Sequence, residues 1–179
     1  MTSNHHASYV LGYTRATMDG TKRSDMVTWS KTQKAVLNSD CGLPIRSAYS
    51  SSFGVGFYSS VFQTMHEEDF LWAKKITDEY RSIRKYFDKD FYIHGSQVFD
   101  PTSWAIFQYH DAETESGIVM AFRRSESPFD SVTVTLKGLT EGKKYTFRNL
   151  DDGTEALSGG ELKILLPEKR SSVIFEYRL

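Results

Sequence analysis

Two serine–aspartate pairs in the first quarter of the chain carry residue types suited to acid–base chemistry. Asp25 ends the segment Lys22-Arg23-Ser24-Asp25, and Asp40 ends Asn38-Ser39-Asp40. A carboxyl group can protonate a leaving group and later take a proton from water when it is positioned against the substrate. Taken singly, each pair also fits a turn in which the aspartate caps a helix. The two pairs define a candidate site that has a structural alternative.

The other reactive side chains form no recognisable site pattern. The five histidines are scattered without a metal-binding spacing, which favours surface or turn positions. No motif places a histidine partner for Cys41, so we expect a small buried residue rather than a thiol nucleophile. Arg123 and Arg124 should point to opposite faces of a strand, which favours surface ion pairs over a phosphate clamp. We therefore predict neither a metal nor a cofactor.

Length and charge limit what the chain can do. Its 179 residues are too few for a complete (β/α)8 barrel, which takes about 250. A net charge of −1 gives no field that would attract nucleic acid or an anionic membrane, and no apolar run is long enough to span a bilayer. One cysteine excludes an internal disulfide, and residues 1–16 lack the apolar core of a signal peptide. We expect a cytoplasmic protein, or a piece of one, without nucleic-acid or membrane partners; a homo-oligomer is left open.

One helix and a series of strands must position these residues. Apolar side chains recur every three or four positions across 66–87, with acids in the first turn and bases in the last, which predicts an amphipathic helix. From residue 88 onward apolar and polar residues alternate, and turn residues separate the runs. Such spacing is typical of an antiparallel β-sandwich. The clearest runs are 106–109, 118–122 and 132–136.

Three motifs follow one another between residues 104 and 145: Trp-x-x-x-Gln, then Gly-x-x-x-x-Phe-Arg-Arg, then Leu-x-Gly-Leu with a later Tyr. They resemble the C-terminal β-domain of glycoside hydrolase family 36, the α-galactosidases. The resemblance covers about residues 20–179 and implies an accessory sandwich that follows a catalytic barrel. The matching residues are Trp104, Gln108, Gly117, Phe122, Arg123, Arg124, Leu136, Gly138, Leu139 and Tyr145.

The serine–aspartate pairs resemble the same family. Its barrel carries a Gly-Gly-x-Arg-x-Asp strand end, and the next strand ends in Ser-Asp, whose aspartate is the general acid/base. By this resemblance Asp40 is the acid/base, while Gly20, Arg23 and Cys41 contact substrate. Asp25 is then a substrate contact, or the acid/base itself if Arg23-Ser24-Asp25 matches the Ser-Asp motif. Barrel chemistry does gather at the C-terminal ends of strands.

These observations lead us to expect an α+β chain. Residues 1–88 would form the last strands and helix of an incomplete (β/α)8 barrel, and 89–179 an antiparallel β-sandwich. The resemblance implies a retaining hydrolase of α-linked galactosides, with a galactoside oligosaccharide as substrate. Its nucleophile would lie upstream, so the chain alone should be inactive. The alternatives are a sandwich that binds carbohydrate through exposed aromatics such as Trp104 or Tyr109, and one that binds a protein.

Overall fold

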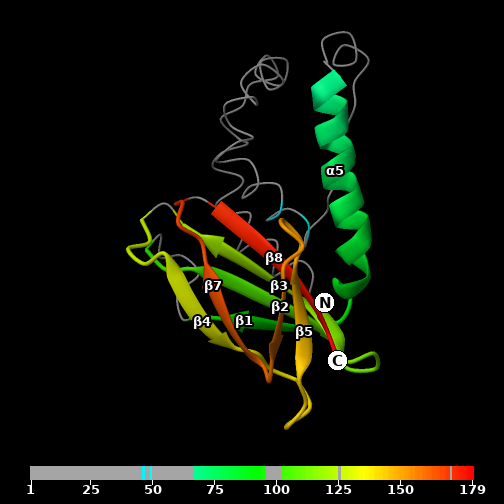
Figure 1. Cartoon of the computed structure of the whole chain (residues 1–179), viewed down its shortest axis with the longest axis vertical. Helices are drawn as coiled ribbons and strands as arrows, with labels where there is room; N and C mark the ends of the chain where they lie inside the picture. Colours follow the sequence, from blue (N-terminus) through cyan, green and yellow to red (C-terminus); the bar gives the residue numbers. More distant parts are fainter. Residues whose placement is uncertain (1–45, 47–48, 50–66, 96–101, 125, 170) are drawn as a thin grey trace. The chain divides into compact units, whose positions relative to one another are not determined.

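The computed structural model is organised as two compact units, 1–82 and 83–179. The residues that the structure describes are Arg46, Tyr49, 67–95, 102–124, 126–169 and 171–179. The helical elements whose bounds lie within these residues are α5 (Glu67–Ile83) and the 3-10 helix η1 (Arg84–Tyr86). The strands are β1 (Asp90–His94), β2 (Ala105–Asp111), β3 (Ser116–Arg123), β4 (Ser131–Thr135), β5 (Tyr145–Asn149), β6 (Glu155–Ser158), β7 (Glu161–Leu165) and β8 (Ser171–Arg178) (Figure 1).

Helix α5 supplies nearly all of what is described of the first unit. It confirms the helix predicted over 66–87, whose last turn is 3-10 rather than α. Its Glu79 carboxylate accepts hydrogen bonds from Arg46 Nη2 at 2.7 Å and from the Tyr49 hydroxyl at 3.0 Å. The Tyr49 and Tyr80 rings also pack at 5.5 Å. Neither described helix is long and apolar enough to cross a bilayer.

The described residues of the second unit form two antiparallel sheets. The larger has the strand order β1-β2-β3-β8-β5-β6, and the smaller pairs β4 with β7. Figure 1 shows the β4–β7 pair lying over one face of the larger sheet. The three runs predicted at 106–109, 118–122 and 132–136 fall in β2, β3 and β4, which confirms the β-rich second half.

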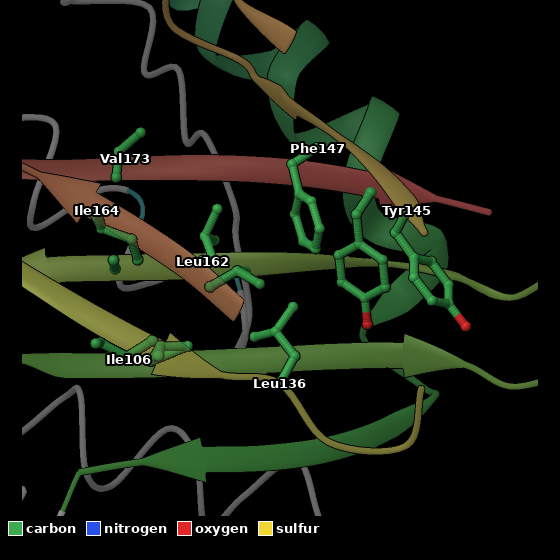
Figure 2. Close-up of a cluster of buried hydrophobic side chains, with 11 residues drawn as sticks. Ile106, Leu136, Tyr145, Phe147, Leu162, Ile164 and Val173 are labelled. Carbon is green, nitrogen blue, oxygen red and sulfur yellow. The ribbon is translucent and has the colours of Figure 1, made fainter. Parts of the chain in front are cut away.

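The core lies between the two sheets. Alternate residues of β7 are buried and exposed, as the two-residue period of a strand requires. Leu162 and Ile164 of β7 and Leu136, just after β4, face Phe147 and Val173 of the larger sheet (Figure 2). The remaining buried members of this cluster are Ile106, Val119, Ala121, Val134, Tyr145 and Tyr177.

Strands β2 and β3 of the larger sheet are buried on the opposite face as well. The segment that follows α5 contributes to this, because the Phe87 ring meets the Tyr109 ring edge-on at 5.1 Å. The Tyr86 hydroxyl donates to Glu176 at 3.1 Å on the same face. Strands β2 and β3 are consequently buried along almost their whole length. Tyr109 is 1% exposed, so the prediction that it is available to stack on a sugar is wrong.

Candidate functional site

The residues predicted to do chemistry lie outside the part of the chain that the structure describes. These residues are Gly20, Arg23, Asp25, Asp40 and Cys41, and their roles stay predictions. Within the described residues, no group of three or more His, Cys, Asp or Glu side chains could hold a metal ion. The described residues do contain a buried cluster of hydrogen-bonded polar side chains, which lies inside the second unit.

Gln108 is the centre of that cluster. Its side chain projects from β2 into the layer between the sheets and is fully buried. The amide nitrogen donates to the Lys137 carbonyl at 2.8 Å and to the Tyr177 hydroxyl at 2.9 Å. The amide oxygen accepts from the Lys137 N–H and from His94 Nε2, both at 2.9 Å. An amide has two N–H donors and two acceptor lone pairs, so protein groups occupy all four.

The two histidines of the cluster are buried, although surface or turn positions were expected. His94 lies on β1, and its Nε2 must carry the hydrogen because the Gln108 oxygen is an acceptor. His110 Nδ1 is 3.1 Å from the Tyr177 hydroxyl, and the two rings stack with 6.0 Å between centroids. His110 Nε2 is buried and has no hydrogen-bond partner.

Burial sets the protonation of the cluster. It lowers the pKa of His94, and the charge of nearby Lys137 lowers it further, against the opposing effect of the hydrogen bond that His94 donates to Gln108. Burial also raises the pKa of Tyr177 well above the ordinary value for a tyrosine, again against a hydrogen bond from Gln108. Both groups are therefore neutral at pH 7, as buried groups without an ion partner should be.

The cluster fixes the position of the chain segment that follows β4, residues 137 and 138. Gly138 has φ of +73°, and a Cβ there would lie 2.9 Å from the Tyr92 hydroxyl and 3.0 Å from the His110 ring. Only glycine fits both the left-handed backbone and this close approach. The Gln108 amide binds the main chain of the preceding residue, Lys137, on both its N–H and its carbonyl. Gln108 of the Trp-x-x-x-Gln motif is thus hydrogen-bonded to the main chain of the Leu-x-Gly-Leu motif.

Tyr145, the later tyrosine of this motif, links the segment after β4 to the β2–β3 turn by hydrogen bonds. The Tyr145 hydroxyl accepts from the Thr140 N–H at 3.0 Å and donates to the Glu115 carboxylate in a short hydrogen bond. Thr140 Oγ1 donates to the same carboxylate at 2.6 Å. Glu115 occupies the β2–β3 turn with φ of +49°, an uncommon conformation for a residue with a side chain. The hydrogen bonds from Thr140 and Tyr145 lower the pKa of Glu115.

The prediction that Arg123 and Arg124 form surface ion pairs is wrong, because both side chains are buried. Arg123 and Arg124 are 5% and 9% exposed. Arg123 Nη1 donates to the carbonyls of Leu166, at 2.8 Å, and Pro167, while Nη2 donates to the Ser127 carbonyl at 3.3 Å. One guanidinium therefore fastens the loops before β4 and after β7 to the end of β3.

The arrangement as a whole is suited to holding loops rather than to acid–base catalysis. Gln108 has no hydrogen-bonding capacity left for a ligand, and both Nη atoms of Arg123 donate to main-chain carbonyls. The motif resemblance includes Gln108 but does not predict what its side chain does. A polar residue on the inward face of an apolar strand was the available signal, because such a residue needs hydrogen-bond partners inside the protein.

Comparison with solved structures finds a similar fold in parts of several glycoside hydrolases. The GH36 α-galactosidase AgaA from Geobacillus stearothermophilus matches with a TM-score of 0.56 and 19% identity over 76% of this chain and 19% of that one. AgaB from the same organism matches with a TM-score of 0.56 and 18% identity over 76% and 19%. The galactosidase domain of the α-galactosidase–sucrose kinase AgaSK matches with a TM-score of 0.54 and 16% identity over 74% and 18%.

These matches confirm, at the level of the fold, the resemblance to family 36 enzymes that the motifs predicted. The chain spans about a fifth of the length of the solved structures it matches. Comparison of the sequence with protein-family models and with curated proteins finds no match.

Proposed function

We propose that this chain is the C-terminal part of a retaining α-galactosidase-like glycoside hydrolase that acts on α-linked galactosides. The supporting observation is the fold, which is similar to that of GH36 α-galactosidases over about three quarters of the chain. The motif residues add to it, since Gln108, Gly138 and Tyr145 have specific structural tasks in the β-unit. A chain that covers about a fifth of those enzymes holds only part of what they need.

In this proposal residues 1–88 belong to the catalytic barrel and 89–179 form the accessory sandwich. Asp40 protonates the leaving oxygen and then removes a proton from the attacking water. Gly20, Arg23 and Cys41 contact the sugar, and Asp25 either assists them or takes the role of acid/base. The nucleophile belongs to an earlier barrel strand, so this chain by itself does not hydrolyse glycosides. Two carboxylates complete such a double displacement without a cofactor.

The alternative of a non-catalytic binding module through Trp104 and Tyr109 has less support. Tyr109 is inside the β-unit, and Trp104 is partly buried against the core cluster. The indole nitrogen of Trp104 also donates to the Phe129 carbonyl at 3.3 Å. Those two rings therefore do not form a solvent-facing pair that could stack on a sugar.

Hydrolysis of p-nitrophenyl α-galactoside tests the proposal. The assay compares this chain alone with a hybrid enzyme in which the chain replaces the matched part of AgaA. We expect no turnover by the chain and turnover by the hybrid. Asp40→Asn should lower the hybrid's kcat by about 10²- to 10⁴-fold, the usual contribution of general acid–base catalysis. Asp130→Asn, which changes an exposed aspartate of the β-unit, should leave kcat unchanged.

Three outcomes would contradict parts of this assignment. A hybrid that is folded by circular dichroism yet inactive would remove the hydrolase proposal. Activity that survives Asp40→Asn but disappears with Asp25→Asn would move the acid/base role to Asp25. Turnover by the isolated chain would show that the nucleophile is present after all.

A further inference from the structure

Arg46 and Tyr49 bind the same carboxylate of helix α5. Arg46 donates to Glu79 from Nε at 2.9 Å and from Nη2 at 2.7 Å, so the guanidinium and the carboxylate form a bidentate pair. The Tyr49 hydroxyl donates at 3.0 Å to the Glu79 oxygen that accepts from Arg46 Nε. The Tyr49 N–H donates to the Arg46 carbonyl at 3.2 Å, so both side chains belong to one closed turn. Three hydrogen bonds therefore fix this turn on α5.

The ion pair between Arg46 and Glu79 is buried. Their side chains are 10% and 13% exposed, and Tyr49 is 2% exposed. Removing two charges from water costs about as much as their attraction returns, so such a pair stabilises a fold little more than two apolar side chains of similar size. A bidentate pair does fix an orientation, because both hydrogen bonds form only when the two planar groups are aligned. The pair is thus better suited to holding a position than to stabilising the fold.

The turn at Arg46 closely follows the segment that carries proposed catalytic residues. Asp40 precedes Arg46 by six positions, and Cys41 precedes it by five. Six residues span at most about 20 Å, so the position at which Arg46 is held limits where Asp40 can lie. The partner Glu79 is 33 positions away in sequence and belongs to a helix of 17 residues. A catalytic group must be held within about 0.5 Å of its working position, which calls for support of this kind.

We propose that Arg46, Tyr49 and Glu79 are positioning residues for the acid/base of the proposed hydrolysis. They act through Asp40, by fixing on α5 the end of the segment that carries it, and not by contact with the sugar. This inference rests on the proposed function, because it takes Asp40 as the acid/base. It adds that the catalytic rate depends on a buried ion pair outside the proposed substrate contacts.

Glu79→Gln in the AgaA hybrid tests this role. The change keeps the size of the side chain but replaces one acceptor oxygen with an N–H donor, which breaks the bidentate pair. A misplacement of about 1 Å can cost about 10²-fold in rate, so we expect kcat to fall by about 10- to 100-fold, with a much smaller change in KM. Asp78→Asn is the matched control, because Asp78 is the preceding residue of α5 and pairs with Lys74 at the exposed surface. It should leave kcat unchanged.

A double variant separates positioning from stability. Arg46→Met combined with Glu79→Leu replaces the two charges with apolar side chains of similar size. This should restore the urea midpoint that Glu79→Gln lowers. It does not restore the bidentate geometry, so kcat should stay low. Recovery of kcat together with the urea midpoint would show that the pair only stabilises the fold, and would overturn the proposal.

Nuclear magnetic resonance of the full chain gives a readout that needs no activity. Glu79→Gln should shift the amide resonances of Ser39, Asp40 and Cys41, whereas Asp78→Asn should not. Unchanged resonances, or equal shifts in the two variants, would overturn the positioning role. Shifted amides with an inactive unmodified hybrid would keep the coupling between the ion pair and this segment and remove the proposed function. An active hybrid without such shifts would do the reverse.

Discussion

Replacing Gln108 with leucine, which has a similar size, removes the amide and takes away the hydrogen bonds that its partners make to it inside the β-unit. The Lys137 N–H and carbonyl, the His94 N–H and the Tyr177 hydroxyl each lose a bond of 2.8 to 2.9 Å. A buried polar group left unsatisfied costs about 1–3 kcal/mol. The Lys137 main chain is only partly buried and regains water, so the summed cost is reduced. We expect the free energy of unfolding to fall by about 3–5 kcal/mol.

Urea unfolding followed by far-UV circular dichroism measures this loss. Tyr177→Phe removes one partner of the same network, and the double variant should show a coupling energy of about 0.5–3 kcal/mol with Gln108→Leu. Thr133→Val, on the exposed side of β4, is the control and should change stability by no more than about 0.5 kcal/mol. If Gln108→Leu also falls within that range, the buried amide is not a structural tie and our reading of the motif is refuted.

Two further changes probe the same region. Gly117→Ala would place a Cβ 2.1 Å from the Tyr109 carbonyl oxygen, and the paired strands cannot separate to admit it. We expect a loss of about 3 kcal/mol or more by scanning calorimetry, whereas Gly159→Ala, with 3.7 Å of room, should be tolerated; equal effects would refute the packing argument. The folded-state pKa of His94 is lower than its ordinary value of 6.5, so the folded chain binds fewer protons than the unfolded chain below that pH. Stability should therefore be constant above about pH 6.5 and decline as the pH falls through the folded pKa, and His94→Gln should flatten this slope in urea titrations at several pH values.

The elements that follow from short-range patterns were predicted well. The apolar residues of 66–87 predict the helix, because residues three and four positions apart lie on the same helix face. The strands followed from alternation and from turn residues, such as Asp151, Asp152 and Gly153 between β5 and β6. Alternation did not reveal how deeply β2 and β3 are buried, since both of their faces are covered.

Side chains with distant partners could not be placed from the sequence. Arg123 is buried because its acceptors include the Leu166 carbonyl, 43 positions away. His110 is buried because Tyr177, 67 positions away, lies beside it. No local sequence pattern predicts either partner. We therefore expected Arg123 and His110 to be exposed to solvent, which is wrong. The candidate catalytic residues Asp25 and Asp40 stay predictions, since they lie outside the described residues.

The position of β8 has a consequence for how the β-unit folds. This strand lies between β3 and β5 and pairs with both, although it is the last strand in the chain order. Its Tyr177 hydroxyl meets Gln108 across 69 positions of sequence. Pairings of such high contact order form late and slowly, because a long loop must close before they contribute. While the protein is being synthesised, β3 and β5 therefore present unpaired edges until β8 has left the ribosome. The interval before β8 arrives is when this unit is most exposed to aggregation and most dependent on chaperones.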